Sequence, residues 1–66
     1  MAYKKFQAWL VENGIKQSET ADFLGIDRAT FNNKLHRRNG ADFGLEEVRR
    51  MCKHYRLSAS EFFLIP

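Results

Sequence analysis

The chain has a single cysteine, a single proline and no long apolar run. With only Cys52 present, no internal disulfide framework can form, which excludes the disulfide-rich secreted domains and indicates a reducing compartment. No apolar stretch approaches the ~20 residues of a membrane span. The opening "MAYKKFQAWL" does not have a signal-peptide pattern, because charged residues interrupt it. We therefore expect a soluble, cytoplasmic protein that has no membrane partner.

The side-chain arrangements that catalysis requires are also lacking. The sequence has no acid–base pair, no nucleophile with a positioned base and no glycine loop that could cradle a phosphate. Cys52 and His54 are two residues apart and cannot share a helix face, so they do not form a metal site. We expect no enzyme, no catalytic residue, no metal and no cofactor, and we assign Cys52 to the core.

What the chain does contain is enough apolar material for one small domain. Its 66 residues are 44% hydrophobic and 14% aromatic, which is typical of a folded protein and not of a disordered one. A chain of this length can bury only one compact core. We assign residues 1–66 to a single domain.

Positive charge is concentrated in one stretch. The net charge is +3 and the isoelectric point is about 9.4, so the excess is modest overall. Between residues 28 and 41, however, there is no acidic residue, while four cations and a histidine are present: Arg28, Lys34, Arg37, Arg38 and His36. Such a local excess favours a partner that is negatively charged.

Helical spacing and stop signals predict an all-α fold with five helices and no strand. Asp27 is a good N-cap, Gly25 accepts the left-handed conformation that ends a helix, and Ser58 with Glu61 forms a capping box. The expected helices cover residues 3–13, 17–24, 28 to 36 or 37, 45–55, and a short final segment ending near Leu64. The side chains expected at inward positions are Phe6, Trp9, Leu10, Ala21, Leu24, Phe31, Leu35, Leu45, Val48, Met51, Cys52 and Tyr55.

The second and third of these helices flank the tripeptide "GID", residues 25–27. Two short helices joined by a three- or four-residue turn with glycine form a helix-turn-helix, whose second helix enters the DNA major groove. Ala21 is small where the helices cross, and Phe31 supplies an apolar anchor halfway along the second helix. The alternative is that any all-helical domain contains glycine-terminated helix pairs.

The segments "IKQSETADFLGIDRATFNNKL" and "LSASEFF" resemble the lambda-repressor-like helix-turn-helix family of phage repressors, Cro proteins and xenobiotic-response-element regulators. The resemblance extends from Phe6 to Leu64. It implies a five-helix fold, a bacterial or phage origin, and transcription regulation by dimers bound to operator DNA. The chain differs from the family in having Thr20 at a position that is often a buried aliphatic residue. It also has Leu10 and Leu35 where many members pair an arginine with a glutamate.

At about 100° per residue and with Phe31 facing the core, helix 28–36 turns four positions away from the core: Ala29, Asn32, Asn33 and His36. Arg28 lies in the first turn, which points into the groove in this docking mode. Arginine can bind guanine, asparagine can bind adenine, and an alanine methyl can contact thymine. The predicted base-reading residues are Arg28, Ala29, Asn32 and Asn33. The alternative for each is an exposed residue on a solvated helix.

A second set is predicted to contact DNA phosphates. Gln17 matches the family position at which a side-chain amide and backbone N–H groups meet a phosphate. Lys34 in the last turn of the recognition helix and the residues that follow that helix complete the set, which is Gln17, Lys34, Arg37, Arg38 and the backbone of Asn39 and Gly40. The alternative for the charged members is again a solvated face. Asp27 is interpreted as the N-cap, with a cytosine contact as its other option.

The basic end of helix 45–55 is given a structural interpretation. Glu46 has the spacing to pair with Arg49 and Arg50, and cations at a helix C-terminus are favoured by the helix dipole. The same reasoning covers Lys53 and Arg56.

The apolar run "FFLIP", residues 62–66, is too long for a short helix to bury completely. We expect Phe62 to face inward and Phe63, Leu64 and Ile65 to form a homodimer interface, which could assemble only on DNA. A two-fold dimer requires an inverted-repeat operator. The alternative is that the run only completes the core.

The sequence thus predicts a sequence-specific regulator of double-stranded DNA, acting as a repressor or Cro-like protein. The alternative is a helical protein-interaction module, such as an antirepressor or antitoxin-like partner, that kept the fold and lost operator binding. A steep loss of affinity with salt separates the first from the second.

Overall fold

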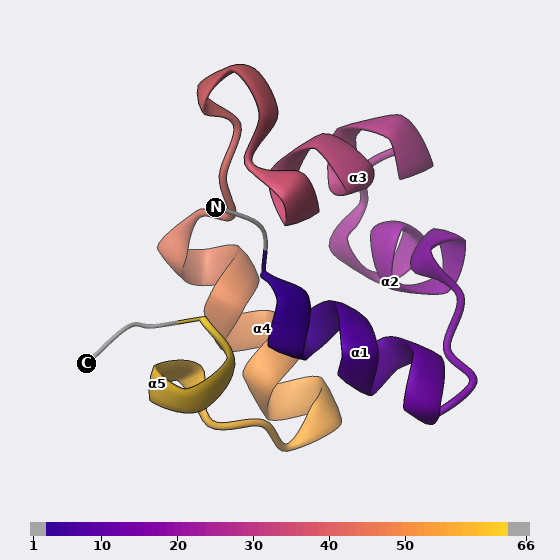
Figure 1. Ribbon diagram of the computed structural model, residues 1–66, viewed down its shortest axis with the longest axis vertical. Helices are drawn as coiled ribbons and strands as arrows, with labels where there is room; N and C mark the ends of the chain where they lie inside the picture. Colours follow the sequence, from indigo (N-terminus) through magenta and orange to yellow (C-terminus); the bar gives the residue numbers. More distant parts are fainter. Residues whose placement is uncertain (1–2, 64–66) are drawn as a thin grey trace.

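Helices and short connections account for the whole part of the chain that the computed structural model describes, residues 3–63 (Figure 1). Within that range there are five α-helices, one short 3-10 turn and no β-strand. The helices are α1 (Lys4–Glu12), α2 (Gln17–Leu24), α3 (Arg28–His36), α4 (Leu45–Tyr55) and α5 (Ala59–Phe62), with the turn η1 (Arg38–Gly40) between α3 and α4. None of these helices is both long and apolar enough to span a bilayer.

Helices α2 and α3 pack directly against each other. In Figure 1 they lie on one side of the molecule, while α4 and α5 lie on the other and α1 crosses between them. The N–H of Tyr3 donates to the carbonyl of Leu35 (3.0 Å), so the start of α1 is tied to the end of α3. The described chain measures 24 × 24 × 20 Å.

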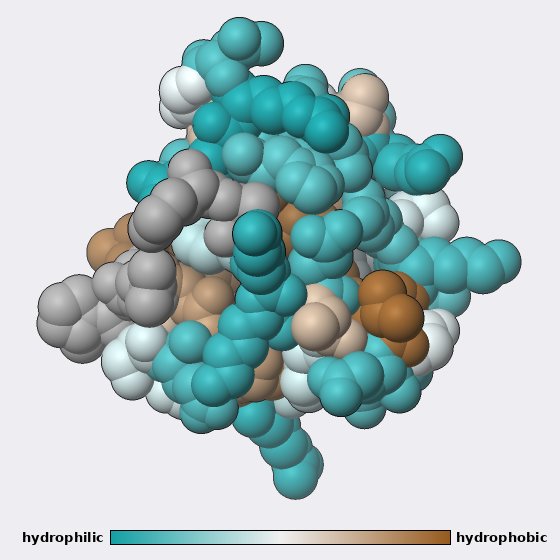
Figure 2. Space-filling view, in the orientation of Figure 1, coloured by the Kyte–Doolittle hydropathy of each residue, from teal (hydrophilic) through white to brown (hydrophobic). Residues whose placement is uncertain are grey.

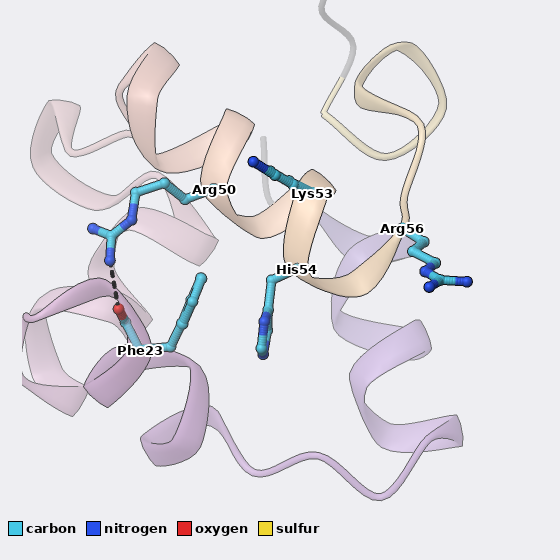
Figure 3. A pocket seen from close by; sticks show the side chains of 5 residues that line it. All are labelled: Phe23, Arg50, Lys53, His54 and Arg56. Atoms are coloured by element: carbon cyan, nitrogen blue, oxygen red, sulfur yellow. Dashed lines mark hydrogen bonds between the residues drawn. The ribbon is translucent and has the colours of Figure 1, made fainter.

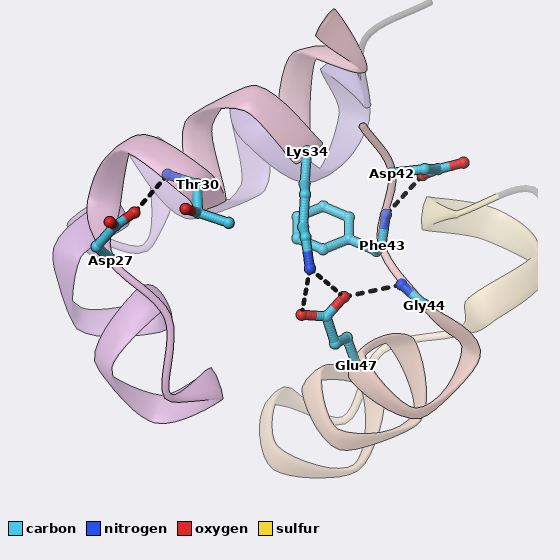
Figure 4. Close-up of polar contacts among 7 residues, drawn as sticks. All are labelled: Asp27, Thr30, Lys34, Asp42, Phe43, Gly44 and Glu47. Atoms are coloured by element: carbon cyan, nitrogen blue, oxygen red, sulfur yellow. Dashed lines mark hydrogen bonds and ion pairs between the residues drawn. The ribbon is translucent and has the colours of Figure 1, made fainter. Parts of the chain in front are cut away.

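The turn between α2 and α3 has the conformation expected from the sequence. Gly25 is left-handed, with φ 75° and ψ 25°, and the N–H of Ile26 returns to the carbonyl of Ala21 (3.0 Å). Asp27 caps α3, because its side chain accepts a hydrogen bond from the N–H of Thr30 (2.7 Å; Figure 4). That bond stabilises the carboxylate and lowers the pKa of Asp27 below its ordinary value. The predicted bounds of α2 and α3 are confirmed.

Each of helices α1 to α4 contributes two buried apolar side chains to the core, while Phe43 and Phe63 enter it from outside the helices. Leu10 and Leu35 are both buried in it, so apolar packing occupies the positions where the resembled family often has an ion pair. Leu45 was expected to face inward but is 56% exposed, because α4 begins at this residue and its first turn projects beyond the core. Cys52 and Trp9 are half-buried against the core, whose buried apolar members are Phe6, Leu10, Ala21, Leu24, Phe31, Leu35, Phe43, Val48, Met51 and Phe63.

The C-terminal phenylalanines have the opposite orientation to the one predicted. Helix α5 ends at Phe62, earlier than expected, and Phe63 then turns inward, where it is only 2% exposed. The ring of Phe63 packs 4.9 Å from that of Phe6, and Phe62 is half-buried with Lys5 above its ring. Phe63 is therefore core and not interface, which corrects the prediction; Leu64 and Ile65 lie outside the described residues.

Thr20 and Tyr55 join α2 to α4 through a hydrogen bond between their hydroxyl groups (2.8 Å). Thr20 is completely buried, so a hydroxyl without a partner at this position would be costly. The bond explains how a threonine occupies a position at which the family often has an aliphatic side chain.

Candidate nucleic-acid interface

Four residues of α3 were predicted to read bases, and they do not have equal exposure. Arg28, Ala29 and Asn33 are exposed, whereas Asn32 is half-buried. Two adjoining surface hollows meet at Arg28: one is lined by Lys16, Gln17, Ser18 and Arg28, the other by Arg28, Ala29 and Asn32. The start of α2 and the start of α3 therefore form one continuous surface, which we call the α2–α3 face.

Asn32 is held at both ends of its side-chain amide. Its Nδ2 donates to Oε1 of Gln17 (3.0 Å), and its Oδ1 accepts from Nη1 of Arg38 (2.8 Å). A residue predicted to read bases thus connects two residues predicted to contact phosphates. These two hydrogen bonds were not predicted, because the angle of a side chain on its own helix does not show which residues of another segment it will meet.

Lys34 does not present a free charge on the α2–α3 face. Its Nζ lies 2.9 and 2.8 Å from the two carboxylate oxygens of Glu47 (Figure 4), and these side chains are only 22% and 19% exposed. Glu47 also accepts the N–H of Gly44 (2.8 Å) and so completes the start of α4. The phosphate contact predicted for Lys34 stays a prediction, but its ammonium group is already paired.

Arg37 is also partnered, although more loosely. Its guanidinium lies 3.1 Å from the carboxylate of Asp42 and 5.4 Å above the ring of Tyr3. Tyr3 donates its hydroxyl to the same carboxylate, and burial, together with this bond and the negative charge of Asp42, raises the pKa of Tyr3 to about 12. Arg37, Asn39 and Gly40 all have positive φ angles, and Asn39 and Gly40 are exposed in the turn that follows α3.

The cations that remain uncompensated define the electrostatics of the face. Among residues 3–63 the ion pairs join Lys5 to Glu61, Lys34 to Glu47 and Arg37 to Asp42. Arg28 belongs to none of them, and Arg38 bonds only to a neutral amide. Hydrophilic side chains cover most of the upper part of the molecule in Figure 2, over α3 and the loop after it. The positive charge open to a partner here comes from Arg28, Arg38 and Lys16, which is exposed in the same hollow as Arg28 and belongs to none of these ion pairs.

The basic end of α4 is arranged differently from the prediction. Glu46 pairs with neither Arg49 nor Arg50 within the described range. Arg50 turns towards α2 instead and donates to the carbonyl of Phe23 (2.8 Å). The expectation of local ion pairs within α4 is therefore wrong, because the end of α2 offers Arg50 a carbonyl that no backbone N–H reaches.

The thiol and the potential metal ligands form no reactive centre within residues 3–63. Burial raises the pKa of the Cys52 thiol, so the thiol is protonated at neutral pH. In this part of the chain no three histidine, cysteine, aspartate or glutamate side chains converge in the way that a metal site needs.

No protein-family model, curated protein or solved structure matches the chain. The resemblance to the lambda-repressor-like family therefore depends on the motif residues alone. Any functional assignment must be argued from the geometry of the α2–α3 face.

Proposed function

We propose that this protein is a sequence-specific double-stranded DNA-binding regulator of the lambda-repressor-like helix-turn-helix type, with α3 as the recognition helix. The observation that carries the proposal is the surface around the start of α3. Arg28, Ala29 and Asn33 are exposed there beside the first turn of α2, and the left-handed Gly25 with the Asp27 cap fixes the turn between the helices. This is the end of a recognition helix that approaches base edges in helix-turn-helix docking.

The exposed residues have chemistries that suit base recognition. Arg28 has no ion-pair partner within residues 3–63 and can donate two hydrogen bonds to guanine. Asn33 can bind adenine in the same bidentate way, and the methyl group of Ala29 can contact thymine. We assign Asn32 a positioning role, because both ends of its amide already bind protein groups.

Phosphate contacts would come from both sides of α3. Gln17 lies in the first turn of α2, where backbone N–H groups lack helical partners, and Arg38 is oriented by Asn32. Arg37 could exchange Asp42 for a phosphate, since that ion pair is 38% exposed on each side. The backbone of Asn39 and Gly40 completes the set. Lys34 contributes least, because Glu47 neutralises it.

Selection of binding sites from random duplex DNA tests the proposal directly. A preferred sequence should emerge. The affinity of the protein for it should fall steeply as salt rises, because the basic side chains that bind phosphates release the counterions condensed on the DNA. Arg28→Ala should weaken the binding free energy on the preferred site by about 1–3 kcal/mol and relax the sequence preference at one base pair. Arg38→Ala should weaken all sequences alike and reduce the salt slope by about one. Equal losses on preferred and random DNA for Arg28→Ala would remove it from the base-reading set.

The proposal includes a homodimer on an inverted-repeat operator, with recognition helices about 34–36 Å apart. Because Phe63 belongs to the core, the apolar residues left for a C-terminal interface are Leu64 and Ile65. Stoichiometry on a palindromic site is the measurement. If cooperative binding of two protein chains to one DNA site persists when both Leu64 and Ile65 are replaced by serine in a protein that still folds, the interface lies elsewhere.

A helical protein-interaction module is the second candidate, and one observation favours it. A further hollow at the end of α4 combines cations with aromatic rings and lies apart from the α2–α3 face. The absence of sequence-selective, salt-dependent binding to duplex DNA would favour this candidate over the first.

A further inference from the structure

The further hollow lies where the end of α2 meets the C-terminal half of α4 (Figure 3). The rings of Phe23 and His54 stack there with centroids 4.2 Å apart and planes 17° from parallel. Arg50 reaches over to Phe23, whereas Arg56 lies beyond His54 and its guanidinium points away from the rings. The residues that line this hollow, which we call the α4 hollow, are Phe23, Arg50, Lys53, His54 and Arg56.

Arg50 is fixed in place by its contacts with Phe23. It donates from Nη2 to the Phe23 carbonyl, and its guanidinium lies 5.1 Å from the centre of the Phe23 ring. The N–H groups of Gly25 and Ile26 donate to the carbonyls of Asp22 and Ala21, which leaves the Phe23 carbonyl at the end of α2 without a backbone donor. Arg50 supplies the missing hydrogen bond. This structural role uses one of the five N–H donors of the guanidinium and leaves others for a ligand.

The remaining cations of the α4 hollow have no structural explanation of that kind. Neither Lys53 nor Arg56 belongs to an ion pair within residues 3–63, and both are exposed. No acidic residue lines the hollow. The helix dipole favours Lys53 near the end of α4, but it explains neither the absence of acids nor the stacking of an exposed His54 on the half-buried Phe23. Cations gathered around a hollow concentrate positive potential in it.

The α4 hollow and the α2–α3 face use different sides of α2. Gln17 and Phe23 are six residues apart, which separates them by about 9 Å along the helix and about 120° around it. A duplex lying along α3 would therefore leave the α4 hollow open.

We propose that the α4 hollow binds an acidic segment of a partner protein. Carboxylates of the segment pair with Lys53, Arg56 and the free N–H groups of Arg50. An apolar side chain packs on the exposed His54 side of the ring pair, because Arg50 lies over the other face of Phe23. A DNA backbone fits this hollow less well, because its phosphates form a regular outward row and offer no apolar group to the exposed His54 ring. The contact is small, so the interaction is transient.

The test uses a fluorescent peptide of glutamates around a central phenylalanine, and a matched peptide with glutamine in place of glutamate. Lys53→Gln with Arg56→Gln should weaken binding of the acidic peptide on the order of tenfold. The control, Lys4→Gln with Arg49→Gln, removes the same charge from exposed positions outside the hollow and should change affinity less than twofold. Thermal unfolding confirms that both double variants are folded.

Changes in the NMR chemical shifts of the backbone amides locate the bound peptide. Shifts around Phe23 and His54 that need the glutamates would support the proposal. Equal losses in the two double variants would mean that net charge alone attracts the peptide, and shifts centred on Arg28 and Asn33 would assign it to the α2–α3 face; either overturns the proposal. It is also overturned if the Lys53/Arg56 variant loses affinity for random duplex DNA while peptide binding is unchanged, because the hollow would then be a nucleic-acid site.

Discussion

The α2–α3 face and the α4 hollow both carry uncompensated cations, yet they are built from different surroundings. On the α2–α3 face the cations stand among amides, with Asn32 linking Gln17 to Arg38. In the α4 hollow they surround a stacked pair of aromatic rings. The comparison teaches that a net charge of +3 predicts little by itself, and that the groups between the cations determine which anion fits.

The largest effect is expected from Glu47→Ala, which should damage the α2–α3 face and leave the α4 hollow intact. The change leaves the mostly buried ammonium group of Lys34 unpaired and the N–H of Gly44 without its acceptor. We expect a loss of about 2–3 kcal/mol in the free energy of unfolding, measured with urea. Glu46→Ala is the matched control, since Glu46 is exposed and makes no ion pair within residues 3–63. A loss as large in the control would show that α4 needs charge in its first turn and not the bond to Lys34.

Gly25→Val should follow, with a loss of about 1–2 kcal/mol from backbone strain at positive φ. A Cβ at this position would meet nothing within 4 Å, so the effect isolates conformation from steric crowding. DNA affinity should fall with stability, because the turn sets the angle between α2 and α3. The substitution Gly25→Asn is the control and should cost less, since asparagine tolerates the left-handed region. Unchanged melting and DNA binding in Gly25→Val would contradict the role given to this turn.

Asn32→Ala should have a smaller effect and should sharpen the contrast between the two regions. Removing the amide frees Gln17 and Arg38, so affinity for DNA should fall by about fivefold, which corresponds to about 1 kcal/mol, without a new base preference. Binding of the acidic peptide at the α4 hollow should not change. Loss of preference at one base pair, seen by site selection, would instead return Asn32 to the base-reading set.

The smallest expected effect is a pH dependence at Tyr3, because its hydroxyl meets Asp42 at an exposed site where solvent screens the interaction. Folding raises the pKa of Tyr3 from 10.0 to about 12, so the neutral hydroxyl stabilises the fold fully below pH 10 and this stabilisation is lost as pH rises through 12. Tyr3→Phe has no such titration. The difference in stability between wild type and variant should therefore shrink between pH 10 and pH 12, measured by urea unfolding. A constant difference across this range would contradict the assigned shift.

The helices were predictable because their signals are local. Asp27 caps α3 by accepting the N–H of the residue three positions later, and Gly25 ends α2, so the sequence alone predicted the limits of both helices. The bonds that shape the candidate sites connect residues far apart in the chain: Lys34 with Glu47, Thr20 with Tyr55, and Arg50 with Phe23. No periodicity encodes those pairs. The inversion of Phe62 and Phe63 has the same origin, because the packing of Phe6 and Phe43 decides which ring enters the core.

The carboxylate of Glu47 serves α3 and α4 at once, since it pairs with Lys34 and caps the first turn of α4. The orientation of α3 is thus restrained before any ligand arrives. In the proposed DNA complex, a helix held in this way would lose little conformational entropy on entering the groove, so less of the binding free energy of each base contact would be spent on ordering α3. Docking would then resemble the meeting of two rigid bodies, with the association rate set by diffusion and charge and the lifetime of the complex set by base contacts.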